Sequence, residues 1–280
     1  MRLKGFLTLM RPVNCLMMGF AVLIGAYLVD VESIGFSIKL ALGFITAFTL
    51  AGTAMVVNDY YDREIDAINE PNRPIPSGLV KPREALLFAA FLTFIGLLSA
   101  FLTNLNCLLI AISAYFILVA YTTKGKRTGF LGNLMVSTCV AIPFIYGGFI
   151  TSETLSPITY IFSVLAFLAN TGREITKGIV DVEGDARESV KTIAVLYGKN
   201  MAAVTASIFY ISAILLSLLP PLLGMVSIYF VPPVLIADSG FLASSILLVR
   251  KPSRENARRI KNLALLWMIA GLVAFMAGKI

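Results

Sequence analysis

The sequence has few of the residues that soluble enzymes commonly use for chemistry. Among 280 residues there is no histidine, there are one tryptophan and three cysteines, and only 14% are charged. The absence of histidine excludes a histidine general base and a histidine-ligated metal centre. Cys15, Cys107 and Cys139 stand singly in apolar stretches, without the spacing of a metal site or a disulfide framework, so they are expected to pack as small core residues.

Apolar residues take the place of the missing charge. They make up 58% of the chain and give a mean hydropathy of +0.86, whereas a soluble domain carries about 25% charged residues. The composition therefore predicts an all-α integral membrane protein, a single domain over residues 1–280. The apolar runs predict about nine membrane helices, with eight as the alternative, at 12–30, 37–57, 84–103, 105–122, 129–150, 156–172, 201–219, 224–249 and 261–279.

The first of these runs follows a basic amino terminus, but it is long enough to span a bilayer and lacks a small-residue cleavage site. We therefore expect it to be retained as a membrane helix. Counting charges by alternate loops orients the bundle: 21 of the 23 Lys and Arg residues fall on one side, and only Lys39 and Lys279 on the other. The richer side is expected to face the cytoplasm, and this explains the net charge of +7 without a nucleic-acid partner.

The second expected span is followed directly by a motif that contains an amide and three aspartates within nine positions, Asn58-Asp59-x-x-Asp62-x-x-x-Asp66. If the segment stays helical, Asn58, Asp62 and Asp66 lie at i, i+4 and i+8 and share one face. Three oxygen ligands on one stripe suit a hard divalent cation. The competing interpretation is a hydrated acidic loop at the membrane surface.

A second acidic motif, Asp181-Val182-Glu183-Gly184-Asp185, follows the sixth expected span on the same side of the membrane. Asp181 and Asp185 are again at i and i+4, although Gly184 weakens the prediction of an unbroken helix. The two acidic loops hold 11 of the 16 acidic residues and are expected to face one mouth of the bundle. So much negative charge predicts bound Mg²⁺, which completes its coordination with water and substrate phosphates, and a diphosphate would bridge two such ions.

Basic and polar residues near these motifs are candidate substrate contacts. Charge-assisted hydrogen bonds to phosphate oxygens are expected from Arg63, Arg73, Lys124, Lys126, Arg127, Arg173, Lys177 and Lys191, of which Arg73, Arg173 and Lys177 adjoin the acids. Orientation of the loops in the bilayer is the alternative for each of them. Asn14 and Asp238 are polar residues inside expected spans, where they either pair within the bundle or contact substrate.

Magnesium-bound diphosphate at the rim of an apolar bundle indicates a particular reaction. When diphosphate leaves a prenyl chain, an allylic carbocation remains, and metal ions stabilise the departing oxygens. The prenyl chain would lie among the apolar helices. Tyr60, Tyr61, Tyr115 and Tyr121 are candidates to shield the cation, with anchoring at the membrane interface as the alternative.

The first motif with its tail Asn72-Arg73-Pro74-Ile75-Pro76-Ser77-Gly78, together with Asp181-x-x-x-Asp185, resembles the intramembrane UbiA-type prenyltransferases. Arg11-Pro12 before the first expected helix is similar to that family as well. The resemblance implies nine membrane helices around a large cavity that opens towards lipid. It also implies two Mg²⁺ ions around a prenyl diphosphate, held by Asn58, Asp59, Asp62, Asp66, Asp181 and Asp185.

Family members often carry a Tyr and a Lys four residues apart after the fourth helix. Here Tyr121 is followed by lysines at positions 124 and 126, so the resemblance leaves open which lysine meets the diphosphate. The expected catalytic set is Asp62, Asp66, Asp181, Asp185 and Lys124; the expected substrate-binding set is Asn14, Arg63, Arg73, Tyr121, Lys126, Arg127, Arg173 and Lys177.

Within the family, the chain most resembles the archaeal ether-lipid branch. This implies transfer of a geranylgeranyl group to the hydroxyl of geranylgeranylglyceryl phosphate, a lipid-alcohol phosphate, at the cytoplasmic side of the cell membrane. One alternative is an aromatic prenyltransferase that acts on 4-hydroxybenzoate or a quinone precursor. Another, from a different class, is a cation-coupled secondary transporter that uses the acidic residues as ion ligands.

Overall fold

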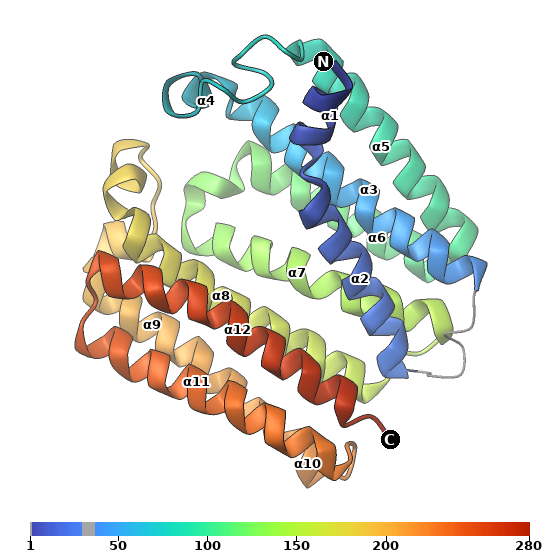
Figure 1. Ribbon diagram of the computed structural model, residues 1–280, viewed down its shortest axis with the longest axis vertical. Coiled ribbons are helices and arrows are strands. Elements are labelled where there is room, and N and C mark those ends of the chain that lie inside the picture. Colours follow the sequence, from blue (N-terminus) through green and yellow to red (C-terminus); the bar gives the residue numbers. More distant parts are fainter. Residues whose placement is uncertain (1, 30–36) are drawn as a thin grey trace. The chain divides into compact units, whose positions relative to one another are not determined.

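The computed structural model describes residues 2–29 and 37–280, and every regular element in these ranges is a helix (Figure 1). Residue 30, the last of the first expected span, lies outside the described residues. The α-helices are α1 Arg2–Met10, α2 Pro12–Val29, α3 Ile38–Tyr61, α4 Arg63–Asn69, α5 Pro82–Thr103, α6 Leu105–Thr123, α7 Phe130–Thr151, α8 Pro157–Arg187, α9 Ile193–Ser217, α10 Leu219–Leu222, α11 Val231–Arg250 and α12 Arg254–Ala277. Two short 3₁₀ helices, η2 Gly125–Thr128 and η3 Ile228–Phe230, complete the set. The all-α prediction is confirmed.

Eight helical segments of the described chain are long and apolar enough to cross a membrane, close to the nine expected. The segment that does not qualify is α8, which begins at Pro157 and covers the rest of the expected span 156–172. Its apolar part gives way to polar residues from Asn170 onwards, and the helix continues as far as Arg187. Counting whole helices by their hydropathy therefore leaves α8 out, although the apolar run in its first half predicted a membrane span.

The chain divides into two compact units, which are described separately. Unit 1 comprises Met1–Thr123 and Ile142–Leu155, and unit 2 comprises Lys124–Ala141 and Ser156–Ile280. The division falls within α7, so this helix contributes to both units. The first aspartate motif belongs to unit 1 and the second to unit 2.

In unit 1, α3 packs against α2 on one side and α5 on another, with α6 alongside and α1 near the end of α3 that carries the first motif (Figure 1). Polar side chains tie these apolar helices together. The Tyr146 hydroxyl donates to Thr46 Oγ1 at 3.2 Å, and Asn104 Nδ2 donates to the carbonyl oxygen of Phe149 at 2.7 Å. Such bonds between membrane helices supplement the packing of small residues.

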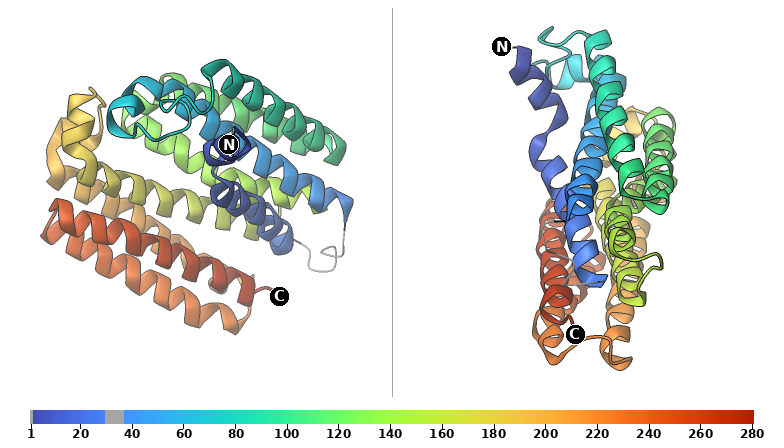
Figure 2. Two further views of the ribbon diagram at one scale, coloured as in Figure 1. Left: turned by 45° about the horizontal axis from the view of Figure 1, so that its top comes forward. Right: turned by 90° about the vertical axis from the view of Figure 1, so that its right-hand side faces the viewer.

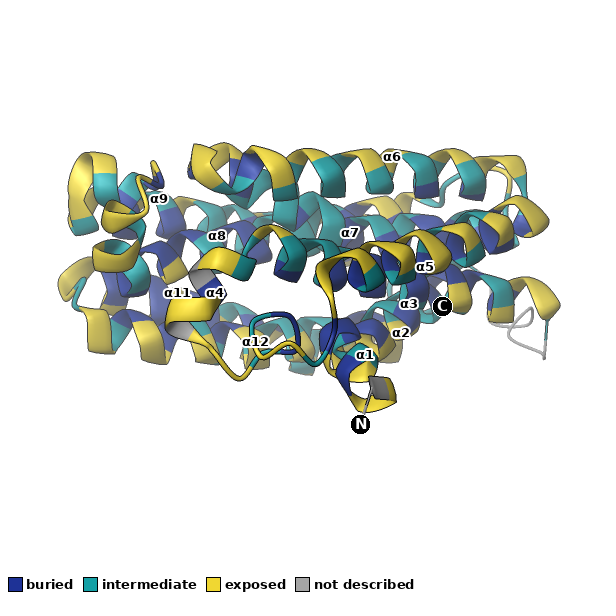
Figure 3. Ribbon diagram, turned by 90° about the horizontal axis from the view of Figure 1, so that it is seen from above, coloured by how far each residue is buried: buried dark blue, intermediate teal, exposed yellow. Residues whose placement is uncertain are grey.

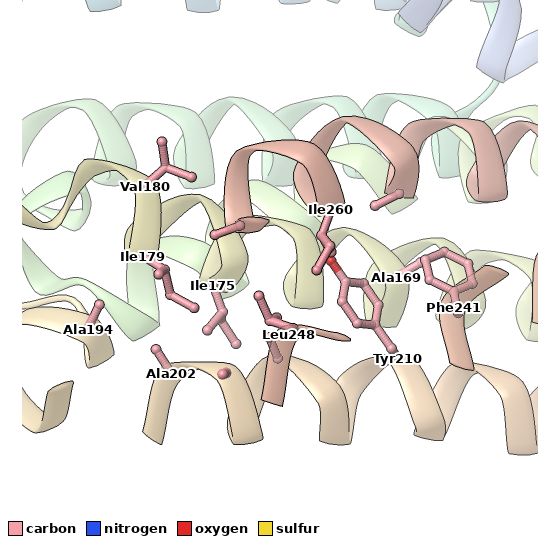
Figure 4. Packing of buried hydrophobic residues seen from close by; sticks show 14 residues of the cluster. Ala169, Ile175, Ile179, Val180, Ala194, Ala202, Tyr210, Phe241, Leu248 and Ile260 are labelled. Carbon is pink, nitrogen blue, oxygen red and sulfur yellow. The ribbon is translucent and has the colours of Figure 1, made fainter. Parts of the chain in front are cut away.

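In unit 2, the helices α8, α9, α11 and α12 pack side by side around a common core (Figure 2). Figure 4 shows Ile175 and Ile179 of α8 pointing into this core together with Tyr210, Leu248 and Ile260, all of which are at most 1% exposed. The buried Tyr210 hydroxyl lies 3.1 Å from Thr176 Oγ1, so its polar group is satisfied. This core fixes the half of α8 that leads into the second motif.

The outer faces of the membrane helices are apolar and exposed. Figure 3 shows broad exposed stretches along α5 and α6, and on α5 these include Leu87, Phe91, Phe94 and Phe101, at 58–71% exposure. A water-soluble protein would not leave so many large apolar groups on adjoining turns. The faces suit contact with lipid.

Candidate active site

The first motif lies where α3 ends and α4 begins, and the helical hydrogen-bond pattern continues across this junction. The backbone N–H of Asp62 donates to the carbonyl oxygen of Asn58 at 2.9 Å, and that of Asp66 to Asp62 at 2.8 Å. Asn58 and Asp62 therefore share a face, and Asn58 Nδ2 donates to Asp62 Oδ2 at 3.0 Å. The condition set from the sequence, that the segment stays helical, is met at these residues.

The other two aspartates of the motif are paired with arginines. Arg11 Nη2 lies 2.7 Å from Asp59 Oδ1, and Arg73 Nη1 lies 2.6 Å from Asp66 Oδ2 and 3.6 Å from Asp59 Oδ1. The side chains of Asp59 and Asp66 are only 5% and 9% exposed. Because the two carboxylates are buried, water screens their attraction to the arginines only weakly. Arg11 and Arg73 therefore neutralise two of the three carboxylates of the motif.

The tail of the motif holds Arg73 in this position. The N–H of Val80 donates to the carbonyl oxygen of Pro74 at 2.9 Å, and the side chains of Ile75 and Val80 are buried against unit 1. Burial by itself would lower the pKa of Arg73, but the hydrogen bond to Asp66 and the nearby carboxylate charges outweigh it and raise the pKa above its ordinary value. Arg73 is thus held as a cation among the acids.

Three further substrate-binding candidates lie in unit 1, namely Arg63, Asn14 and Tyr121. Arg63 donates to the carbonyl oxygen of Tyr60 at 2.9 Å and lies over the Tyr60 ring, 4.7 Å from its centroid. Asn14 lies beside Met55, with Nδ2 4.0 Å from the sulfur. Tyr121 is in the last turn of α6. Among the candidates of unit 1, Arg73 contacts the aspartates of the first motif directly.

The second motif is part of α8, which runs without interruption through Gly184 to Arg187. Lys177, Asp181 and Asp185 lie at i, i+4 and i+8 and so form one stripe along the helix. Burial and, next, the negative charge of Asp181 raise the pKa of Asp185 to about 6, while the positive charges of Lys177 and Lys126 act in the opposite direction. A cation beside these two carboxylates would relieve their repulsion.

Arg173 of α8 has a donor that the described residues leave without a partner. Its Nη1 lies 2.8 Å from Glu174 Oε1, and Lys177 Nζ lies 3.6 Å from Glu174 Oε2. Nε of Arg173, however, is buried and makes no hydrogen bond within the described part of the chain. A buried charged donor without an acceptor is unfavourable, and an oxygen atom of a bound ligand would satisfy it.

The basic loop with Lys124, Lys126 and Arg127 is anchored to the segment that follows α8. The N–H of Lys191 donates to the carbonyl oxygen of Arg127 at 3.2 Å. Gly129, which ends the loop, has a φ of 65°. A Cβ atom at this position would overlap the carbonyl oxygen of Lys191. Glycine is thus required both for the backbone conformation and for the close approach of the two segments.

We expect Gly129→Ala to lower the thermal midpoint of the detergent-solubilised protein and to reduce its activity, because the basic loop must move away from residue 191. Gly78→Ala is the matched control: Gly78 has a φ of 75°, but nothing lies within 4 Å of its Cβ position. The control incurs only the backbone strain of about 1 kcal/mol. Equal effects of the two changes on midpoint and activity would contradict the anchoring role.

Asp238, Arg11 and Arg254 each make a polar contact within their own unit. Asp238, the charge within an expected span, accepts a hydrogen bond from Ser217 Oγ at 2.8 Å, which is pairing within unit 2. Sequence reasoning did not select Arg11 or Arg254 as site residues, yet Arg11 pairs with Asp59, and Arg254 Nε donates to the carbonyl oxygen of Val180 at 3.1 Å, one residue before the second motif. Both look like ordinary basic residues at membrane-helix ends, so composition does not distinguish them.

The oxygen donors of the two motifs can be compared with what the expected Mg²⁺ requires. Within residues 2–29 and 37–280, no group of three or more His, Cys, Asp or Glu side chains is placed to hold a metal ion. Mg²⁺ nevertheless needs only one or two carboxylates, because water and substrate phosphates complete its octahedron. Asp62 beside Asn58, and Asp181 with Asp185, are hard oxygen donors of this kind, so the residues fit the ion.

Comparison with known proteins places this site in context. The model of the UbiA prenyltransferase family matches residues 18–269. The digeranylgeranylglyceryl phosphate synthase of Methanosphaera stadtmanae is 32% identical over 278 residues, which cover 99% of this chain and 100% of that protein.

Two solved structures are similar. One, of digeranylgeranylglyceryl phosphate synthase, has a TM-score of 0.89 and 31% identity and covers 99% of this chain and 98% of that one. The other, a UbiA homolog from Archaeoglobus fulgidus bound to GPP and Mg²⁺, has a TM-score of 0.68 at 17% identity and covers 97% of this chain and 99% of that one. At that identity the second likeness concerns the fold alone.

Proposed function

Because this chain belongs to the UbiA prenyltransferase family, and is therefore a prenyltransferase, we propose that it transfers a geranylgeranyl group from geranylgeranyl diphosphate to the hydroxyl of geranylgeranylglyceryl phosphate. The family predicted from the two aspartate motifs is confirmed by the comparisons, and with it a multi-pass membrane protein. The choice of substrates rests on one observation: the chain is similar over its full length, in sequence and in structure, to digeranylgeranylglyceryl phosphate synthases.

Both aspartate motifs supply the metal ligands in this proposal. Asn58, Asp62 and Asp66 would serve in the first motif, Asp181 and Asp185 in the second, and two Mg²⁺ ions are proposed. A UbiA homolog of similar fold from Archaeoglobus fulgidus binds GPP and Mg²⁺, and this supports the use of magnesium in the proposal. When bound, Mg²⁺ stabilises the negative charge that builds up on the departing diphosphate.

Basic residues of unit 2 are proposed to hold the diphosphate. Arg173 Nε is a buried donor without a partner among the described residues, and Lys177 lies on the same helix one turn before Asp181. Lys126 is near enough to Asp185 for its charge to affect that carboxyl group. Charge-assisted hydrogen bonds from these groups to phosphate oxygens would position the prenyl diphosphate for ionisation. Lys124 and Arg127 extend the same basic loop.

The chain has no histidine to remove the proton of the acceptor hydroxyl. We therefore propose that the bond from the departing diphosphate to the prenyl carbon breaks first. The acceptor oxygen then attacks the allylic carbocation and only afterwards loses its proton, either to an aspartate of a motif or to the departed diphosphate. A hydroxyl oxygen that has begun to bond to a cation is acidic, so a weak base is sufficient.

Incubation of the purified protein with labelled geranylgeranyl diphosphate tests the acceptor. We expect a labelled diether phosphate with geranylgeranylglyceryl phosphate, and no product with 4-hydroxybenzoate. The difference should exceed about 100-fold in kcat/KM, since a site built for one polar acceptor rejects another that leaves its polar groups unpaired. A preference for 4-hydroxybenzoate would replace the ether-lipid assignment with aromatic prenylation.

The purified protein, reconstituted into sealed vesicles, tests whether the active site lies on the same side of the membrane as the basic loops. The distribution of basic residues predicts that this side is cytoplasmic. A membrane-impermeant protease added from outside should cleave the basic loops only in the fraction of molecules that were inserted with those loops outwards. Product formation from water-soluble geranylgeranyl diphosphate added outside should be confined to that same fraction. Activity in the opposite fraction would reverse the proposed orientation.

A further inference from the structure

One carboxylate of the first motif has surroundings unlike those of a metal ligand. The Asp59 side chain is 5% exposed, and one of its oxygen atoms, Oδ1, lies 2.7 Å from Arg11 and 3.6 Å from Arg73. Two guanidinium groups converge on this single oxygen. A divalent cation at this oxygen would have to displace at least one guanidinium group from an aspartate that is itself buried, and breaking such a partly buried pair is costly when one partner is left without compensation.

The three residues come from separate parts of unit 1. Asp59 is in α3, Arg73 is in the turn-rich tail that follows α4, and Arg11 is the single residue between α1 and α2. Arg11 has a φ of 51°, in the left-handed region that non-glycine residues seldom adopt. Such a conformation persists when the surrounding structure fixes it, as the buried Met10 and Cys15 and the ion pair to Asp59 do here.

Asp66 is placed differently from Asp59. It contacts only one of the two arginines, Arg73, at 2.6 Å. If Asp66 binds a cation, Arg73 must yield that contact, and its guanidinium group is already within 3.6 Å of Asp59. Asp59 would then hold both arginines. Each guanidinium group has five N–H donors, more than these aspartate contacts use.

We propose that Asp59 is a positioning residue, not a Mg²⁺ ligand: it orients Arg11 and Arg73 so that their remaining N–H donors bind a substrate phosphate group. Both proposed substrates carry such a group, the prenyl diphosphate and the glyceryl phosphate acceptor. The identity of these substrates rests on the proposed function, whereas the role of Asp59 as a positioning residue does not. It adds Arg11 to the site and changes the role that the family resemblance implied for Asp59.

The test compares Asp59→Asn, Arg11→Gln and Asp62→Asn in the full-length detergent-solubilised protein, with Glu64→Gln as control. Glu64 is an acid of the same segment, but its side chain is 85% exposed. Mg²⁺ binding is measured by calorimetry without substrate. Asp59→Asn and Arg11→Gln should leave the dissociation constant for Mg²⁺ within about threefold, because neither removes a ligand, whereas Asp62→Asn should weaken binding at least about tenfold.

Kinetics with each substrate varied in turn identify the phosphate group. Arg11→Gln and Asp59→Asn should raise KM about tenfold for the one substrate whose phosphate the arginines bind, with a smaller change for the other, as expected for loss of a charge-assisted hydrogen bond. The double variant Arg11→Asp with Asp59→Arg exchanges the two charges. It should recover part of the decrease in thermal midpoint that each single change causes. It should not restore KM, because the guanidinium group is then on α3. Asp59→Glu keeps the charge and should retain most of the affinity.

Two results would overturn the inference. If Asp59→Asn weakens Mg²⁺ binding as much as Asp62→Asn does, Asp59 is a ligand. If Arg11→Gln and Asp59→Asn lower the thermal midpoint and leave both KM values unchanged, the ion pair is purely structural. If Asp59→Asn does not fold, Arg11→Gln decides by the same measurements. Failure of the proposed function is distinguishable, since the wild type would then give no product while the Mg²⁺ titrations still assign Asp59.

Discussion

Asp62→Ala and Asp181→Ala should each abolish measurable Mg²⁺-dependent transfer, a loss of about 1,000-fold or more. Each change removes an oxygen donor from one of the two motifs. Stabilisation of a departing diphosphate by a metal ion contributes roughly 4 kcal/mol, and each 1.4 kcal/mol is a tenfold change in rate. The measurement is release of diphosphate and formation of labelled product by purified protein over a range of Mg²⁺ concentrations.

The double variant makes this prediction sharper. If the two motifs serve one reaction, the combination of Asp62→Ala and Asp181→Ala should be hardly worse than either change alone, because residues that act as a unit are not additive. Glu64→Gln and Glu183→Gln, exposed acids of the same two segments, are the controls and should retain activity. Single variants with more than a tenth of the wild-type rate would contradict the assignment.

Membrane helices with apolar residues along their whole length were predicted closely. The expected span 105–122 corresponds to Leu105–Thr123, and 129–150 to Phe130–Thr151. Hydropathy fails where a helix continues into polar sequence. The helix α12 begins at Arg254, not at the expected residue 261, because Ser253 caps it by accepting a hydrogen bond from the N–H of Asn256 at 3.3 Å.

The helix α8 also continues beyond its apolar residues into polar sequence. The sequence predicted a membrane span that ends at residue 172, whereas the helix continues to Arg187. What stabilises the polar half is not visible in its own residues. Ile175 and Ile179 are buried in a core to which α9, α11 and α12, all later in the chain, contribute the other side chains. Tertiary packing therefore carries the second motif on a rigid helix in spite of Gly184.

At the candidate site the sequence predicted the types of residue but not their partners. The spacing of Asn58 and Asp62 was sufficient to predict that they share a face, since the contact is local. The pair of Arg11 with Asp59 joins residues 48 positions apart, and no periodicity in one sequence specifies such a pairing. Which aspartates are paired with arginines, and which are left to bind a metal ion, is therefore decided by the fold and not by the spacing of residues in the sequence.

The second large effect is expected at the crossing of α2 and α7 in unit 1. A Cβ atom on Gly147 would overlap the carbonyl oxygen of Val22 and lie 2.7 Å from the backbone nitrogen of Ala26. The reciprocal position, Gly25, faces the backbone of Phe144 in the same way. The obstacles are backbone atoms of two rigid helices, so no side-chain rotation can make room. Small residues permit this close approach, on which helix packing in membranes depends.

Gly147→Ala should therefore separate the two helices and lower the thermal midpoint by about 10 °C, since overpacking costs up to about 3 kcal/mol and 1 kcal/mol corresponds to roughly 2–4 °C in a chain of this size. Gly271→Ala in α12 is the matched control, because nothing lies within 4 Å of its Cβ position. There the change should be neutral or slightly stabilising, as alanine favours a helix by about 1 kcal/mol. The two variants, compared by thermal unfolding in detergent, separate helix propensity from close packing: equal midpoints would mean that α2 and α7 do not touch through their backbones.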